Sequence, residues 1–352
     1  IELPTYDSIN PDFHAVRILQ QMTRFHLTNN NEDALLDLTL TRLNYILKNS
    51  VLANNTELYY QAIDSMIEKY PNNPIIGEYI HVKAKRLSNQ ASLPVNETDE
   101  DVQFNKVKAL ELCENVIKKF PKTIGAGHCN HLIKSIHAKS INLTTESNVI
   151  PNYPIRYNLE GRNVHELFTK LIRFDHDAYY DDYQSYNNDK QRQKLLEKIR
   201  KTDAVYENHD ILKDFKDYLS HSFEFALPKL EKGFYLLITS TSPEFTEDGE
   251  NIKIAPIIVT DLALNSRRTD NGAYEFLVTN RTNGLPIEGA RIKIWSEKWN
   301  YSQRKYVRVS HGTIGTDSRG KSIFKTNSDN RTFHYMVSYK DDKIPSEQSF
   351  YL

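Results

Sequence analysis

The spacing of apolar residues changes at Ser140, and this change divides the chain into two kinds of structure. From about residue 10 to residue 138, apolar residues recur near every 3.6 positions, which is the spacing of amphipathic helices. After Ser140 the sequence alternates, beginning with Ile141, Leu143 and Thr145, as half-buried strands do. The chain of 352 residues is therefore predicted to fold as helices followed by β-sheets, in two or three domains.

Residues 1–138 are predicted to form tetratricopeptide-like helical hairpins. Apolar stripes predict helices at 33–47, 59–70, 74–87, 107–120 and 124–137. Two of these helices stop at Tyr70-Pro71 and Phe120-Pro121, because proline cannot continue the hydrogen-bond ladder. The two stops align at an offset of 50 residues, which indicates a weak repeat of stacked hairpins. The polar segment 88–105 is predicted to be a loop. Such helices either cap the next domain or bind a protein.

Residues 139–250 are predicted to form a β-sandwich with a largely helical insertion. Strands are expected at 141–145, 155–159, 167–172, 223–227 and 235–237, the last two joined by a hairpin around 227–233. The polar stretch at about 176–220 is the insertion, with a helix near 193–200. An insertion of this size is tolerated because loop-closure entropy grows slowly with length.

Residues 251–352 are predicted to form a second sandwich. Strands are expected at 257–264, 274–279, 290–295, 306–309 and 333–339. Asn271-Gly272, Asn283-Gly284 and Arg319-Gly320 are turn signals between strands. Short strands at this density are typical of an immunoglobulin-like sandwich. The predicted fold class is therefore multi-domain, α plus all-β.

Composition and motifs narrow the function. Lysine and arginine number 45 against 46 acidic residues, so no nucleic-acid footprint is indicated. No run approaches the ~18 apolar residues of a transmembrane helix. The sequence has no Gly-x-Ser-x-Gly, Walker or Gly-x-Gly-x-x-Gly motif. We therefore expect a protein that is not an enzyme, binds no cofactor and has proteins as its partners.

Two clusters of residues carry potential metal ligands. His128 and His131 share a helical face with Cys129 and His137 nearby, but the ligand spacing of a zinc site is missing. Asp175, Asp177, Asp181 and Asp182 surround His176 and offer oxygens to calcium or a carboxylate pair to a glycosidase. The glycine and terminal glutamate of an EF-hand loop are absent there. We expect no metal at either place and a solvated loop at the aspartates.

Cys113 and Cys129 are the two cysteines of the chain. They lie on two helices joined by the Phe120-Pro121 turn, so an antiparallel hairpin brings them toward the ~5.5–6 Å Cα separation of a disulfide. Two interpretations remain open, a disulfide in an oxidising compartment and a pair of buried reduced thiols.

Cations and aromatic residues mix at 298–310, a pattern that can mark a nucleic-acid surface. The alternation of Tyr306, Val307, Arg308 and Val309 more simply predicts an exposed strand guarded by its cations.

Five segments, in their order along the chain, carry a resemblance to a known family. They are the helical lead-in at 109–129 that continues into 140–161, then LPKLEKGFYLLITS at 227–240, VTDLAL at 259–264, TNGLPIEGARIKIW at 282–295 and GTIGTDSRGKSIFK at 312–325. Together they resemble the bacterial branch of the alpha-2-macroglobulin family, in particular its long Bacteroidetes-type members. The resemblance covers about residues 110–352.

The resemblance implies a large protein of the cell envelope, in the periplasm or anchored to the outer membrane, built from consecutive macroglobulin domains. Members of the family are endopeptidase inhibitors that trap proteases through a cleavable bait segment, and many carry a thioester in a Cys-Gly-Glu-Gln-type motif. Neither Cys113 nor Cys129 lies in such a motif. The chain is then expected to be an N-terminal scaffold fragment whose partners are proteases or other macroglobulin domains, with its signal segment removed. A surface adhesin or assembly scaffold that traps no protease is the alternative.

Overall fold

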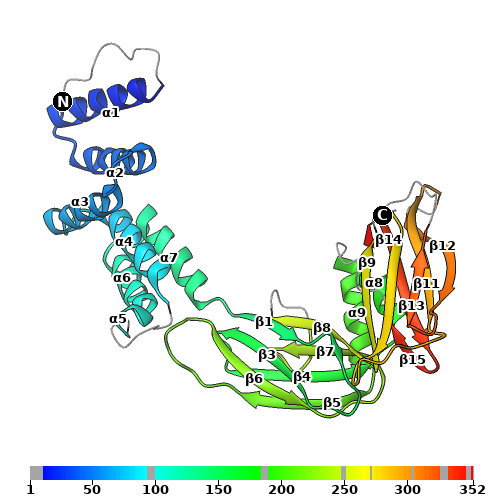
Figure 1. Cartoon of the computed structure of the whole chain (residues 1–352). Helices are drawn as coiled ribbons and strands as arrows, with labels where there is room; N and C mark the ends of the chain where they lie inside the picture. The colour runs from blue at the N-terminus through cyan, green and yellow to red at the C-terminus, as the bar shows by residue number, and fades with distance from the viewer. Residues whose placement is uncertain are drawn as a thin grey trace. The chain divides into compact units, whose positions relative to one another are not determined.

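The computed structural model describes residues 11–92, 100–183, 189–246, 251–269, 272–302, 305–325, 332–345 and 350–351. These residues belong to two compact units (Figure 1). The helical unit comprises Ile1–Ala138 and the short segment Phe215–Ser220, and the β unit comprises Lys139–Asp214 and His221–Leu352. None of the described helices is long and apolar enough to cross a membrane.

The helical unit contains the predicted hairpins. Its helices are α1 (Pro11–Thr28), α2 (Glu32–Asn49), α3 (Asn55–Lys69), α4 (Ile76–Gln90), α5 (Glu100–Gln103), α6 (Asn105–Lys119) and α7 (Ile124–His137). α3 and α6 end one residue before Tyr70 and Phe120, so the predicted proline stops are confirmed. The segment 88–105 was expected to be a loop. This prediction was wrong in part, because α4 extends to Gln90 and α5 lies within the segment.

Close approach of two backbones joins the hairpins. Gly125 in α7 lies against Gly77 in α4, and a Cβ built on Gly125 would be 2.4 Å from the carbonyl carbon of Gly77. Around this contact, α4, α6 and α7 share one apolar cluster that includes Ala109, Val116 and Ala126. Only glycine allows helices to approach this closely, so the packing depends on the absence of a side chain at 125.

A half-buried histidine makes the stability of the helical unit depend on pH. The ring of His81 in α4 lies tilted against the ring of His128 in α7, with ring centroids 5.1 Å apart. Burial, followed by the charges of His128 and Lys85, lowers the pKa of His81 from 6.5 to about 4. Between these two values the unfolded chain binds more protons than the folded chain, so stability falls as the pH falls through this window.

We therefore expect the free energy of unfolding to decrease between pH 7 and pH 5, and to decrease less in a His81→Asn variant. Urea titrations at the two pH values measure the difference. The variant separates the effect of His81 from that of Glu78. Burial raises the pKa of Glu78, so its protonation increases the free energy of unfolding as the pH falls toward that pKa. An identical loss in both proteins would contradict this role of His81.

The first sandwich of the β unit packs a three-stranded sheet on a five-stranded sheet. The smaller sheet has the order β1 (Ser140–Thr145), β3 (Ile155–Arg162), β6 (His221–Leu227), and the larger has the order β2 (Asn148–Val149), β8 (Ile252–Val259), β7 (Gly233–Ser240), β4 (Glu166–Arg173), β5 (Ala204–Ile211). Tyr157, Leu227 and Leu237 lie in the core between the sheets. β4 is buried on both faces, as predicted.

Two helices cover the other face of the larger sheet. α8 (His176–Tyr183) and α9 (Asp189–Lys201) contribute Tyr179, Leu195 and Ile199 to a second core with Leu236 and Ile258. The sandwich is therefore extended to three layers, two sheets and a helical pair. The α9 helix was predicted near its observed position.

The second sandwich packs β13 (Lys321–Phe324), β10 (Tyr274–Asn280) and β9 (Leu262–Arg268) on β12 (Lys305–Gly315), β11 (Arg291–Asn300), β14 (Thr332–Tyr339) and β15 (Asp342–Ile344), with β16 (Phe350–Tyr351) also on β14. Phe276 and Val278 from one sheet meet Ile292, Phe333 and Val337 from the other. The fold class, helices followed by two β-sandwiches of which the first carries a helical insertion, is confirmed.

Three details of the predicted strands were wrong. The segment 257–264 was expected to be one strand, but it contains parts of two strands, β8 and β9. β8 belongs to the first sandwich, so the second sandwich begins at β9 and not at residue 251 as expected. The predicted hairpin at 227–233 joins β6 to β7 across the two sheets of the first sandwich. Turn residues show that a chain reverses, but not which sheet it joins next.

The insertion at about 176–220 is helical only as far as Lys201. After it, β5 forms the edge of the larger sheet by pairing with β4. Most β5 residues are exposed on both faces, with Val205 51% and Ile211 74% exposed, so the strand shows no apolar alternation. Phe215–Ser220 then belongs to the helical unit, where the Lys106 amine donates to the Tyr218 carbonyl (3.0 Å).

Candidate functional site

The chain passes from the first sandwich to the second at Thr260 and Asp261, and a buried carboxylate holds this joint. Asp342, which begins β15, is 3% exposed. Its Oδ1 accepts a hydrogen bond from the Thr260 hydroxyl (2.7 Å), and its Oδ2 accepts one from the Asp261 backbone N–H (2.8 Å). Both donors lie between β8 and β9, so one side chain of the second sandwich fixes the end of the first.

A lysine completes the joint. Lys232 immediately precedes β7, and its amine lies 2.9 Å from Asp261 and 3.7 Å from Asp342. The hydrogen bond to Asp261, together with the surrounding carboxylates, raises the pKa of Lys232. Buried carboxylates are costly unless they are paired, and the lysine supplies the opposite charge.

The insertion contacts the second sandwich beside this joint. Asp177 in α8 forms an ion pair with Arg308 in β12, with 3.2 Å between Oδ1 and the guanidinium. Burial opposes ionisation of Asp177, but the hydrogen bond and charge of Arg308 outweigh it and hold the pKa of Asp177 below its usual value. Burial lowers the pKa of the neighbouring His176. Arg308 also lies over the Trp295 ring, 5.3 Å from its centroid.

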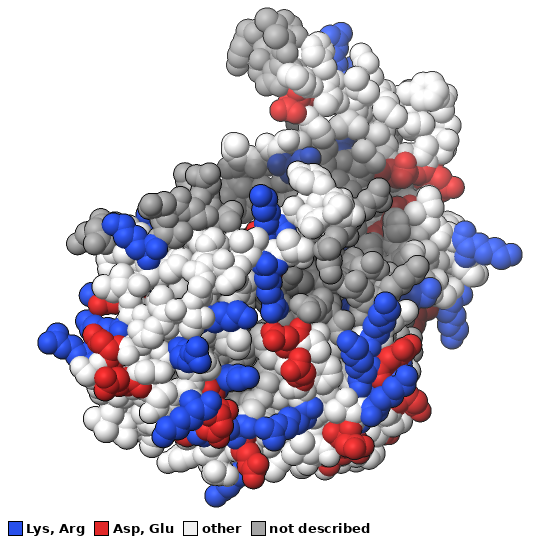
Figure 2. Space-filling model, turned by 90° about the vertical axis from the view of Figure 1, so that its right-hand side faces the viewer, with Lys and Arg blue, Asp and Glu red and all other residues white. Residues whose placement is uncertain are grey.

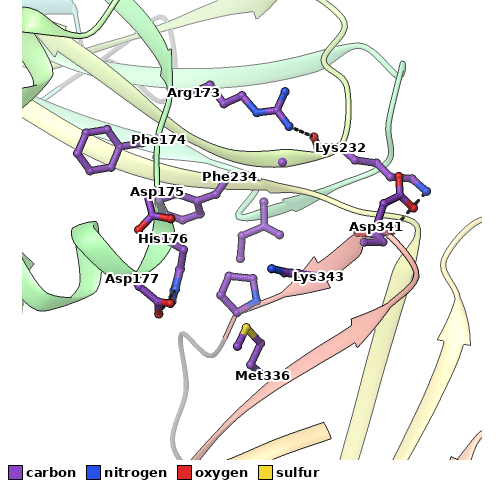
Figure 3. A pocket seen from close by; sticks show the side chains of 14 residues that line it. Arg173, Phe174, Asp175, His176, Asp177, Lys232, Phe234, Met336, Asp341 and Lys343 are labelled. Carbon is purple, nitrogen blue, oxygen red and sulfur yellow. Dashed lines mark hydrogen bonds and ion pairs between the residues drawn. The ribbon is translucent and has the colours of Figure 1, made fainter. Parts of the chain in front are cut away.

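A pocket of about 330 Å³ lies between the two sandwiches at this point. Arg173, His176 and Lys232 line it from the first sandwich, and Met336 and Lys343 from the second (Figure 3). Ligand sites commonly occur where two domains meet, so this pocket is the candidate binding site of the β unit.

The predicted aspartate cluster is split by the structure. Its residues lie at or in the helix α8, so the prediction of a solvated loop was wrong. Asp175 caps the helix by accepting from the Ala178 N–H (2.8 Å), and Asp177 pairs with Arg308. The side chains of Asp181 and Asp182 lie outside the described residues.

The predicted histidine cluster is spread over α7. His128 contacts His81 with tilted rings, and His137 meets Tyr218 edge to face with centroids 5.1 Å apart. Within the described ranges, no group of three or more His, Cys, Asp or Glu side chains is placed to hold a metal ion.

Of the segment 298–310, residues 298–300 end β11 and residues 305–310 begin β12. Trp299 packs on Tyr306 with ring centroids 5.2 Å apart, and Tyr306 is 60% exposed. The predicted exposed strand is therefore present. Figure 2 shows lysine and arginine interspersed with acidic residues on the face that it presents, without a separate basic patch.

The two cysteines meet inside the helical unit. Cys113 in α6 and Cys129 in α7 are both fully buried, both free thiols, and hydrogen-bonded to each other. The hydrogen bond and burial raise the pKa of the Cys113 thiol. A thiol kept protonated in this way reacts slowly until the helices separate.

The residues of the joint were not selected from the sequence. Asp342 lies 82 positions beyond Thr260, and no local pattern links them. Arg173 is the last residue of an apolar strand, and a single cation at a strand end does not indicate a binding site. The Thr260-Asp261 pair between two apolar runs is the one signal that could have indicated a break there.

No family model matches the chain, and no curated protein is similar to it. Parts of solved structures are similar in fold. A native Escherichia coli alpha-2-macroglobulin structure spanning domains NIE-MG1 is 11% identical over 59% of this chain and 95% of that chain, with a TM-score of 0.38.

The native conformation of E. coli alpha-2-macroglobulin gives 11% identity, 58% of this chain and a TM-score of 0.32, but the match spans only 12% of that protein. Red sea bream transglutaminase gives 10% identity over 64% of this chain and 34% of that chain, with a TM-score of 0.22. Identities and TM-scores this low do not establish membership of a family.

Proposed function

We propose that the chain is a scaffold part of a bacterial alpha-2-macroglobulin-like protein, which traps endopeptidases in the cell envelope. The five ordered segments that resemble this family support the proposal. Among the structural features, the joint around Asp342 gives the strongest support to the proposal. The joint fixes two consecutive sandwiches to each other, as the wall of a larger cage requires. In this role the chain binds proteases or further domains of its own protein and performs no catalysis itself.

The site of proteolysis tests this role. The gene product that contains the chain is incubated with a broad-specificity protease, and its fragments are identified by mass spectrometry. We expect one early cut outside the two described sandwiches, followed by compaction that native electrophoresis or sedimentation detects. Scattered early cuts within the sandwiches, without compaction, would contradict the trap and favour a binding scaffold or adhesin.

A disulfide between Cys113 and Cys129 stays a prediction that follows from an oxidising envelope. The two thiols would lose two protons and two electrons to glutathione disulfide, which is reduced to two glutathione thiols. Closing a loop of about 15 residues stabilises a chain by about 3 kcal/mol in the chain-entropy account.

We expect incubation with glutathione disulfide to remove both thiols, slowly because they are buried, and to raise the urea midpoint of the helical unit. Alkylation under denaturing conditions followed by mass spectrometry measures the remaining thiols. In a Cys129→Ser control, Cys113 can form only a glutathione adduct. Two thiols that remain alkylatable after prolonged oxidation would show that the pair stays reduced.

A further inference from the structure

The pocket between the sandwiches has four acidic side chains in its lining, and each already interacts with a neighbouring group. Asp175 caps α8 through the Ala178 N–H. Asp177 pairs with Arg308, and Asp342 holds the joint. The fourth, Asp341, acts on Lys232 and contributes to the raised pKa of that lysine. Asp177 and Asp342 are therefore paired with cations of the protein, while Asp175 serves as a helix cap and Asp341 faces the charge of Lys232.

Two cations of the pocket are not compensated. Within the described parts of the chain, no ion pair joins Arg173 or Lys343 to a carboxylate, and both side chains are exposed. Arg173 donates one hydrogen bond, to the Lys232 carbonyl (3.0 Å), which leaves most of its five N–H donors available. In Figure 3 the amine of Lys343 is directed into the pocket.

The Arg173 guanidinium is held in a fixed position. A Cβ built on Gly233 would lie 3.2–3.4 Å from its nitrogen and carbon atoms, so the guanidinium rests against a backbone without a side chain. The hydrogen bond to the adjacent Lys232 carbonyl fixes it from a second direction. A planar cation that is already oriented loses little entropy when it binds a carboxylate.

Apolar side chains form part of the remaining wall of the pocket, beside His176. Phe234 and Ile258 come from the first sandwich, and Met336 and Pro345 from the second. A volume of about 330 Å³ is at the lower end of the range of ligand sites, enough for one side chain and a carboxylate.

We propose that this pocket binds a small organic carboxylate with an apolar body, such as the C-terminal residue of a peptide, through Arg173 and Lys343. The site lies beyond the proposed scaffold role and requires no trapping activity. Bidentate pairing with arginine suits a carboxylate, while the apolar wall selects against a bare inorganic anion.

The test is a titration of the full chain with N-acetyl-phenylalanine at neutral pH and low salt, followed by calorimetry or saturation-transfer NMR. We expect saturable binding that is at least tenfold weaker for the corresponding amide, for N-acetylglycine and for inorganic phosphate. Arg173→Gln and Lys343→Gln should each weaken binding of the acid by about tenfold, because a charge-assisted hydrogen bond is lost.

Lys229→Gln is the matched control, since Lys229 is exposed in the same unit but does not line the pocket. It should bind like the wild type. Circular dichroism verifies that the surface substitutions preserve the fold. Absence of saturable binding, equal binding of acid and amide, equal binding of phosphate, or unchanged binding in both pocket variants would each overturn the proposal.

Discussion

Replacing Gly125 with alanine is expected to destabilise the helical unit by about 3 kcal/mol, the upper part of the usual range for overpacking. The added Cβ would meet the carbonyl carbon of Gly77 at 2.4 Å, the Glu78 nitrogen at 2.6 Å and the Gly77 oxygen at 2.8 Å. All three are backbone atoms, so no side chain can rotate away. α4 and α7 must separate, which loosens the apolar cluster that they share with α6.

Gly127→Ala is the matched control because it lies one half-turn further along α7. A Cβ there has no neighbour within 4 Å, and alanine is the better helix former by about 1 kcal/mol. The control should therefore be neutral or slightly stabilising. Urea unfolding followed by the helical circular dichroism signal compares the variants. Equal midpoints for the two would show that the glycine contact does not determine the packing of these helices.

Asp342→Ala is expected to destabilise the β unit by about 3 kcal/mol. Removing the buried carboxylate leaves the Thr260 hydroxyl and the Asp261 N–H without their acceptor, and removes one counter-charge of Lys232. Breaking a buried hydrogen-bonded charge pair typically has a cost of this size.

The adjacent Asp341 offers a control of the same chemistry. Its side chain is exposed, so Asp341→Ala should change stability by less than about 0.5 kcal/mol. Trp295 and Trp299 both lie in the second sandwich and report its unfolding by fluorescence. If the two variants unfold at the same temperature, the Asp342 network does not hold the sandwiches together.

The parts of the fold that could be predicted are those with local causes. The Tyr70-Pro71 and Phe120-Pro121 stops placed two helix ends to within a residue, because proline acts on its immediate neighbours. Strands buried on one or both faces, such as β4, were recognised from their apolar residues.

The parts that were missed depend on distant or exposed residues. β5 is an edge strand whose exposed side chains show no alternation, so its segment resembled a polar insertion. α8 follows Asp175, a helix cap that was interpreted as part of a loop. The candidate site combines Arg173, Lys232 and Lys343 through a contact between two sandwiches, and no sequence period extends over such a distance.

We propose that the chain belongs to a physical trap for proteases. The most direct measurement is the residual activity of a protease after it has reacted with the complete gene product, assayed on a large protein substrate and on a small peptide substrate. The account predicts loss of activity toward the protein and retention of activity toward the peptide, because an enclosed protease is shielded and its active site stays free. Full activity toward both substrates would contradict the trap and leave the chain as a binding scaffold.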